Sequence, residues 1–202
     1  MVTQVLERRK ETGEKPMIIL GISGSARKKS YNTALLREAK ELVPPGVELE
    51  IFGISDLPMF NQDVETSPPD LVRRFKDEIR SADAVLFSTP EHNYSVTALL
   101  KNAIEWGNRP PTDNSWDGKP AAVMSASTSM RGGARAQLQL RQIMIDLNMY
   151  AMNQPQLLVA EARGKFDSEP KLTDDKVRAR LRDFVMALVD WTKRMQSSGI
   201  SA

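Results

Sequence analysis

The residues best suited to chemistry begin with a stretch rich in glycine and serine, residues 21–33. An apolar run precedes it and a helical pattern follows it, so several backbone N–H groups and the positive end of a helix dipole would face one point. Side-chain donors and one positive charge are added by Ser25, Ser30, Asn32, Thr33 and Arg27. This set is typical of an anion-binding loop. An ordinary turn with a helix cap is the alternative.

The sequence of this loop also limits the size of the anion. It does not end in the Gly-Lys-Ser/Thr of a Walker A loop, and it lacks the third glycine of the dinucleotide fingerprint. We therefore expect a monophosphate rather than a triphosphate or a pyrophosphate.

A second polar stretch, Pro90-Glu91-His92-Asn93-Tyr94-Ser95, follows another apolar run. Pro90 restrains the turn, the backbone offers donors and acceptors to a flat heterocycle, and Tyr94 could lie against its ring. A proline turn with a helix cap at Ser95 is the alternative. His92 is the only histidine, and a lone histidine is more often structural than catalytic.

A third polar loop, residues 126–133, places hydroxyl groups and the pair Gly132-Gly133 ahead of a helical pattern. Glycines permit close approach of the backbone to a ring, although they also suit a flexible helix entry. Arg131 and Arg135 stand at this loop and could meet an anionic second substrate, but exposed arginines beside loops are common.

Composition excludes several kinds of chemistry. The 202 residues contain no cysteine and one histidine, which rules out disulfides, thiolate nucleophiles and sites that ligate a metal through cysteine or several histidines. We expect no metal and no catalytic side chain, so redox chemistry would need a bound organic cofactor. The net charge of +2 does not indicate a nucleic-acid surface. No stretch approaches the ~20 apolar residues that span a bilayer, so no membrane insertion is expected.

Two hydrolase patterns are also missing. Glu91 and Glu105 are the only acidic residues near the polar loops, too few and too ill-defined for a paired-carboxylate site. Ser23 is not in a nucleophile elbow, because G-x-S-x-G would need glycine at position 25.

Alternating strands and helices must position the three loops. Apolar or alternating runs predict strands, and apolar residues at spacings of three and four predict helices. We expect strands at 17–20, 47–52, 84–88, 121–125, 149–152 and 156–159, and helices at 33–42, 70–81, 97–106, 134–147 and 173–195. Continuous apolar character puts 84–88 at the centre of a sheet, and alternation with acidic residues puts 47–52 at an edge.

This order predicts an α/β domain whose mostly parallel sheet is covered on both faces. In such a sheet the loops after the carboxyl ends of the strands build the ligand crevice. The three polar loops follow the first, third and fourth strands and would share that crevice. We assign residues 16–196 to one domain, residues 1–15 to a mobile leader and residues 197–202 to a flexible tail.

Three motifs occur together between residues 17 and 159. They are Gly24-Ser25-Ala26-Arg27-Lys28-Lys29-Ser30-Tyr31-Asn32, Thr89-Pro90-Glu91-His92-Asn93-Tyr94-Ser95 with Leu100-Lys101-Asn102-Ala103-Ile104-Glu105-Trp106, and Gly132-Gly133-Ala134-Arg135 with Leu140-Arg141-Gln142. In this order they resemble the NADPH-dependent FMN reductase family. The resemblance implies a flavodoxin-like three-layer sandwich with a five-stranded parallel sheet. It also implies non-covalently bound FMN and a homo-oligomer, either a dimer or a tetramer.

The family's site residues can be carried over by position. Its phosphate loop falls on Ser25, Arg27, Ser30, Asn32 and Thr33, its isoalloxazine loop falls on Pro90, Glu91, His92, Asn93 and Tyr94, and its next loop places Ser127 near the flavin. His92 stands where the family commonly has tyrosine, so the backbone would recognise the ring at this position.

The resemblance implies an enzyme, an FMN-dependent NAD(P)H oxidoreductase. NADPH or NADH would pass hydride to the flavin and leave, and a small-molecule electron acceptor such as a quinone or free flavin would take its place. Some members of the family reduce chromate or azo dyes, so these compounds are alternative acceptors for this protein. A flavodoxin-like electron carrier, or a flavin-binding redox sensor without NAD(P)H turnover, is the alternative. We expect a cytoplasmic protein.

Overall fold

The computed structural model describes residues 15–198. Of the predicted leader and tail, only Lys15, Ser197 and Ser198 fall within this range, and the other residues of those two segments lie outside it. In chain order the elements are β1 (Met17–Ser23), α2 (Tyr31–Leu42), β2 (Val47–Phe52), η1 (Gln62–Val64), α3 (Asp70–Ser81), β3 (Ala84–Ser88), α4 (Ala98–Gly107), β4 (Pro120–Ala126), α5 (Ala134–Asp146), β5 (Tyr150–Ala151), β6 (Leu157–Val159), η2 (Ala162–Gly164) and α6 (Asp175–Ser197).

The strands form one parallel sheet in the order β2-β1-β3-β4-β5. The strand β6 also pairs with β4, farther along it than β5 does. This order confirms the predicted flavodoxin-like fold. The edge position of β2 and the full burial of β3 are confirmed as well.

The last position in the sheet is filled by two short strands. Tyr150–Ala151 pairs with the start of β4, and Leu157–Val159 pairs with its end. Pro155 lies between them and has no N–H to donate to a strand neighbour, which explains why the strand leaves the sheet there. The separate strands predicted at 149–152 and 156–159 agree with this interruption.

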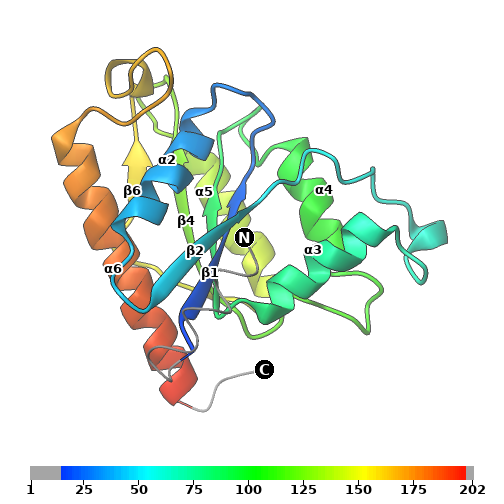
Figure 1. Ribbon diagram of the computed structural model, residues 1–202. Coiled ribbons are helices and arrows are strands. Elements are labelled where there is room, and N and C mark those ends of the chain that lie inside the picture. Colours follow the sequence, from blue (N-terminus) through cyan, green and yellow to red (C-terminus); the bar gives the residue numbers. More distant parts are fainter. Residues whose placement is uncertain (1–14, 199–202) are drawn as a thin grey trace.

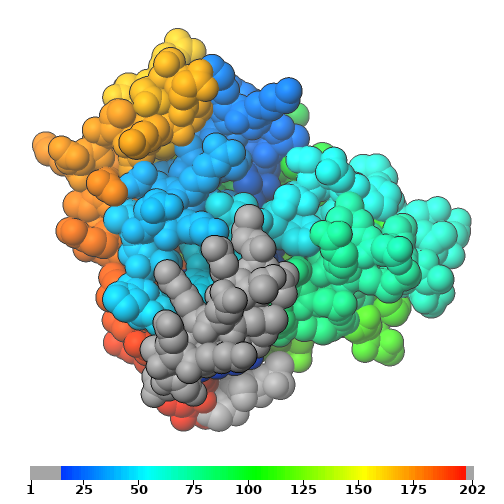
Figure 2. Space-filling view, viewed as in Figure 1, coloured from blue at the N-terminus to red at the C-terminus, as the bar shows by residue number. Residues whose placement is uncertain are grey.

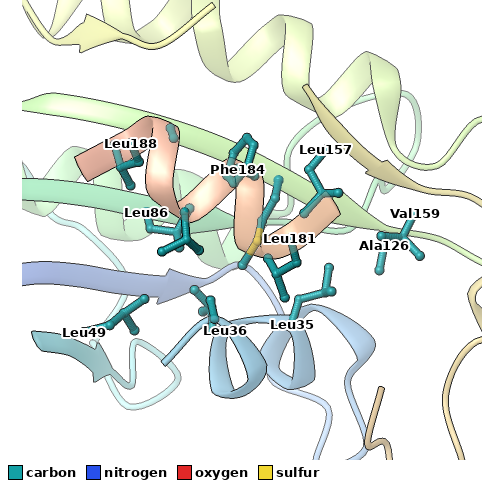
Figure 3. Packing of buried hydrophobic residues seen from close by; sticks show 14 of the residues in the cluster. Leu35, Leu36, Leu49, Leu86, Ala126, Leu157, Val159, Leu181, Phe184 and Leu188 are labelled. Atoms are coloured by element: carbon teal, nitrogen blue, oxygen red, sulfur yellow. The ribbon is translucent and has the colours of Figure 1, made fainter. Parts of the chain in front are cut away.

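Helices cover both faces of the sheet, as expected. One apolar core lies between the sheet and helices α2 and α6, and a second lies between the sheet and helices α3, α4 and α5. Figure 1 shows α2 and α6 together on one side of the strands and α3 with α4 on the other. In Figure 3 Leu36 of α2 and Leu181 and Phe184 of α6 pack beside Leu86 of β3.

Side chains at the helix starts explain where the helices begin. Ser30, Thr97 and Asp174 are the N-caps of α2, α4 and α6, and each accepts a hydrogen bond from a backbone N–H of the first turn. Helix α5 instead has Gly133 as its N-cap, which has no side chain to accept such a bond. Within residues 15–198, no helix is both long and apolar enough to cross a lipid bilayer.

The packing of Gly107 yields a stability prediction. A Cβ at this position would overlap the indole of Trp116, which is fully buried and held between Phe75 and Phe87. Gly107→Ala should therefore lower the free energy of unfolding by about 1–3 kcal/mol, the usual cost of overpacking. Thermal unfolding followed by circular dichroism should show a lower Tm, by roughly 2–4 °C per kcal/mol.

Gly164→Ala is the matched control, because no atom lies within 4 Å of its added Cβ. It should leave Tm close to the wild-type value. A Gly107→Ala variant as stable as the wild type would contradict the packing described here.

Candidate functional site

Three loops meet at the carboxyl edge of the sheet, at the upper edge in Figure 1. Loop 1 (residues 24–30) follows β1, loop 2 (residues 89–97) follows β3, and loop 3 (residues 127–133) follows β4. The strand order reverses direction between β1 and β3, which is where ligands bind in open α/β sheets. The sequence therefore placed the three polar loops correctly.

Loops 1 and 2 are in direct contact at Gly24. Its N–H donates to the Ser88 carbonyl at 2.9 Å, and its carbonyl accepts from the Thr97 hydroxyl at 2.7 Å. A Cβ at Gly24 would lie 2.6 Å from the Thr89 hydroxyl oxygen. Only glycine therefore lets the two loops approach this closely.

Loop 1 presents backbone donors beside the start of α2. Ser30 is buried, and its hydroxyl accepts from the N–H of Thr33 at 3.3 Å. The N–H groups of Ala26, Lys28 and Lys29 donate to no acceptor in residues 15–198. Free backbone N–H groups beside a helix N-terminus are a typical anion-binding site.

The side chains of loop 1 divide between the exterior and the turn itself. Arg27 is exposed, and Ser25 is half-buried, with its hydroxyl accepting from the N–H of Arg27 at 3.4 Å. Just beyond the loop, the Thr33 hydroxyl hydrogen-bonds to that of Ser23 at 2.8 Å. Arg27 thus supplies a positive charge that is free to meet an anion.

Asn32 has a different environment from its predicted neighbours. It is 3% exposed, and its amide pairs with Ala126 through two hydrogen bonds of 2.9 Å, one donated and one accepted. Its oxygen also accepts from the Ser88 hydroxyl at 3.2 Å. The amide therefore joins the start of α2 to the ends of β3 and β4, and the backbone N–H is the donor of Asn32 best placed to serve an anion.

Loop 2 contains a tight hairpin turn. His92 and Ser95 exchange two backbone hydrogen bonds of 3.0 and 2.9 Å, and Asn93 and Tyr94 both have positive φ, +49° and +67°. Two consecutive left-handed residues identify a type I′ turn. His92, Asn93 and Tyr94 are exposed, and Pro90 is half-buried. The backbone of this loop is thus held by its own hydrogen bonds, whereas its three tip side chains are exposed.

Glu91 lies beneath this turn and contacts α5. Its carboxylate accepts from the backbone N–H of Arg135 at 3.1 Å and from the Arg135 Nε at 2.6 Å. Burial raises the pKa of Glu91, but the hydrogen bonds from Arg135 outweigh burial and hold that pKa below its ordinary value. The carboxylate is therefore charged at neutral pH.

Arg135 also lies against an aromatic ring. Its guanidinium carbon is 3.4 Å from the centroid of the Tyr94 ring, at cation–π distance. Its Nε and Nη2 face Glu91, whereas Arg131, the other arginine of this region, is exposed.

Loop 3 is folded tightly on the end of β4. The Ser127 hydroxyl lies 3.1 Å from that of Ser129, and the Ser127 N–H donates to Val159 at 3.0 Å. Gly132 and Gly133 both have positive φ, and a Cβ on Gly133 would lie 2.8 Å from Ser125. Both positions therefore favour glycine, because of their backbone conformation and because loop 3 packs closely on the protein.

A segment that the sequence pattern did not connect with the site also borders it. Residues 160–174 reach loop 1 and the start of α2: Lys29 pairs with Glu169 at 2.5 Å, and the ring centroids of Tyr31 and Phe166 lie 4.9 Å apart. The same segment donates backbone hydrogen bonds to Ser127 and Ser129 of loop 3. Figure 2 shows this orange region adjoining the blue surface of loop 1 and α2. It lacks hydrophobic periodicity, so nothing in the sequence indicated its position.

Thr97 was also missed as a site residue, although its position ahead of an apolar helical run is a cap signal. Among residues 15–198, no group of three histidine or acidic side chains is arranged to hold a metal ion. The N–H groups of loop 1 can hold an anion, and the backbone of loops 2 and 3 offers a surface for a flat ring.

Comparison with known proteins agrees with this geometry. The model of the family described as NADPH-dependent FMN reductase matches residues 17–164. An NAD(P)H-dependent FMN reductase of Pseudomonas aeruginosa is 46% identical over 179 residues, which cover 88% of this chain and 96% of that protein. A quinone reductase of Pseudomonas putida is 45% identical over 173 residues, covering 85% and 92%.

A solved structure is similar over nearly the same length. It is the flavoenzyme NAD(P)H:(acceptor) oxidoreductase FerB of Paracoccus denitrificans, with a TM-score of 0.82 and 36% identity. The superposition covers 89% of this chain and 98% of that one. The similarity therefore extends over most of both chains.

Proposed function

This chain belongs to the NADPH-dependent FMN reductase family and is an FMN-dependent NAD(P)H oxidoreductase, and we propose that it binds FMN across loops 1, 2 and 3 to reduce quinones. The single observation that carries this placement is the set of unpaired N–H groups in loop 1 beside the start of α2, which fits the terminal phosphate. The quinone reductase among its relatives supports the acceptor class.

Two groups of residues fit the two ends of FMN, one its phosphate and the other its ring. The phosphate would be held by loop 1 and the first turn of α2, that is by Ser25, Arg27, Ser30, Asn32 and Thr33. The ring would lie against the backbone of Pro90, Glu91, His92, Asn93 and Tyr94, with Ser127 on the side of loop 3. The tip of loop 2 and loop 3 both contain residues with positive φ, so the course of each backbone is specific.

The protein's contribution to the reaction is binding and orientation. Bound FMN supplies the chemistry, taking a hydride from a nicotinamide and delivering electrons to an acceptor. Loop 1 would anchor the phosphate, and the backbone of loops 2 and 3 would orient the ring for its two substrates. Donor and acceptor would use the same face of the ring in turn. No side chain is required as a general acid, in agreement with a chain that has no cysteine and one histidine. We place the enzyme in the cytoplasm, where NAD(P)H is supplied.

The function can be tested on the purified protein. Protein supplied with FMN and freed of excess should be yellow, and anaerobic NADPH should bleach it. Added benzoquinone should restore the colour, with steady-state turnover following ping-pong kinetics. Dithionite is the control reductant, because an electron carrier would be bleached by dithionite and not by NADPH or NADH. That outcome, or a protein that retains no flavin, would contradict the proposal.

The proposed phosphate site at loop 1 gives a second prediction. Arg27→Ala should weaken FMN by about tenfold or more, since hydrogen bonds to charged groups contribute ~1.5–3 kcal/mol. Riboflavin, which lacks the phosphate, should bind Arg27→Ala and wild-type protein alike. Titrations that follow flavin fluorescence measure both ligands. Equal losses for FMN and riboflavin would refute the phosphate role.

Asn32→Ala provides a contrasting variant, because it leaves Ala126 and Ser88 groups buried without partners. It should lower the free energy of unfolding by roughly 1–3 kcal/mol for each unpaired group, which Arg27→Ala should not do. It should also weaken FMN and riboflavin together, because Asn32 supports the ends of β3 and β4, from which loops 2 and 3 start.

We also propose that the chain forms a homo-oligomer through the face formed by α4 and α5. A groove of about 580 Å³ lies there, bordered by His92 and Asn93 of loop 2, the first turns of α4 and residues 139–143 of α5. On α5, Leu138 and Ile145 are 62% and 80% exposed. Exposed apolar residues beside a groove support a protein interface, and two-fold pairing is the commonest arrangement.

Sedimentation velocity tests this interface. The wild type should sediment as a dimer or a tetramer, and the double variant Leu138→Glu/Ile145→Glu should shift to a smaller species. Met186→Glu on α6, where Met186 is also exposed, is the control and should keep the wild-type state. A monomeric wild type, or an unchanged double variant, would refute this interface.

A further inference from the structure

Helix α5 starts without a capping side chain of its own. Its N-cap, Gly133, has φ +88°, and its first turn contains no acidic residue. The first N–H groups of a helix have no partner within the helix, so they need acceptors from elsewhere. The start of α5 follows directly from loop 3.

Glu91 supplies that acceptor from loop 2. One carboxylate oxygen accepts from the backbone N–H of Arg135, and the other accepts from the Arg135 Nε and lies 2.5 Å from its Nη2. Only 10% of the Glu91 side chain is exposed. The carboxylate therefore caps α5 and pairs with the guanidinium at the same time, across 44 positions of sequence.

The same guanidinium supports the other side of loop 2. It lies against the ring of Tyr94, whose φ of +67° is rare for a bulky residue. A left-handed conformation at such a residue persists only where its surroundings hold it. Arg135 thus contacts loop 2 before the turn, at Glu91, and within the turn, at Tyr94.

We propose that Glu91 and Arg135 are a positioning pair that fixes the distance between loop 2 and loop 3, and through it the seat of the flavin ring. The proposal rests on the function proposed above, in which the ring lies between these two loops. Glu91 then acts through the shape of loop 2 rather than as a carboxylate ligand of the ring, because both its oxygens are engaged by α5. The lowered pKa of Glu91 agrees with this charged pair.

Glu91→Gln and Arg135→Gln test the pair. Each should raise the Kd of FMN and of riboflavin by the same factor, about tenfold, because a charged partner is lost and the phosphate site is untouched. Visible circular dichroism of the bound flavin should change, since it reports the surroundings of the ring. Without flavin, backbone hydrogen exchange at residues 91–95 and 134–137 should be faster than in the wild type.

Two further variants separate positioning from general stability. Arg135→Lys keeps the charge but loses the fork of donors and the planar face, so its effect should lie between wild type and Arg135→Gln. The double variant Glu91→Gln/Arg135→Gln should be little worse than either single variant, because the two side chains act as a unit.

The ion pair between Arg178 and Glu38 is a matched control. Its Nε to Oε1 distance is 2.6 Å and its glutamate is 11% exposed, nearly as for Glu91, but it joins α6 to α2. Glu38→Gln should leave both flavin affinities and the flavin spectrum unchanged.

Three outcomes are distinguishable. Wild-type protein that binds no flavin contradicts the proposed function. Wild-type protein that binds FMN, with the same affinity and spectrum in Glu91→Gln and Arg135→Gln, overturns only the positioning pair. A general loss of stability is identified by Glu38→Gln changing flavin binding as much as Glu91→Gln, and that result also overturns the pair.

Discussion

Parallel pairing of β1, β3 and β4 is the interaction on which the site depends. In this register Ser23 pairs with Ser88, and Ser88 pairs with Met124, so the three strands end nearly level. Beyond that line the backbone has fewer strand neighbours, and its polar groups need other partners. Thr97 and Asn32 supply some of them. The donors left over in loop 1 are those that a ligand can use.

Much of this arrangement could be predicted because it is local. Apolar runs located the strands, and Gly, Ser and Pro placed the loops between them, so the edge that carries the site followed from topology. The partners of individual side chains could not be predicted in this way. Glu91 meets Arg135 across 44 positions, and Asn32 meets Ala126 across 94, and no local pattern encodes such contacts. Residues 160–174 have no periodicity, and they reach the site only because the sheet and α6 bring them there.

The polar residues of the loops therefore differ in role more than their types indicate. Asn32 and Glu91 have their side chains engaged within the protein, whereas Arg27 is exposed. The engaged residues fix the loops, and loops that are already ordered lose less entropy when they bind a ligand. In this reading, support of the loops and contact with the cofactor are divided between different residues of the same motifs.

The cap that α5 receives from loop 2 also makes two distant stretches of the gene interdependent. A chimaera that took loop 2 from one relative and α5 from another would keep the helix start only if the acidic residue and its arginine were exchanged together. Residues 89–97 and 132–137 are thus a single module for recombination, although about 35 positions, including α4 and β4, lie between them. Redesign of the ring pocket by loop grafting has to treat both segments as one insert.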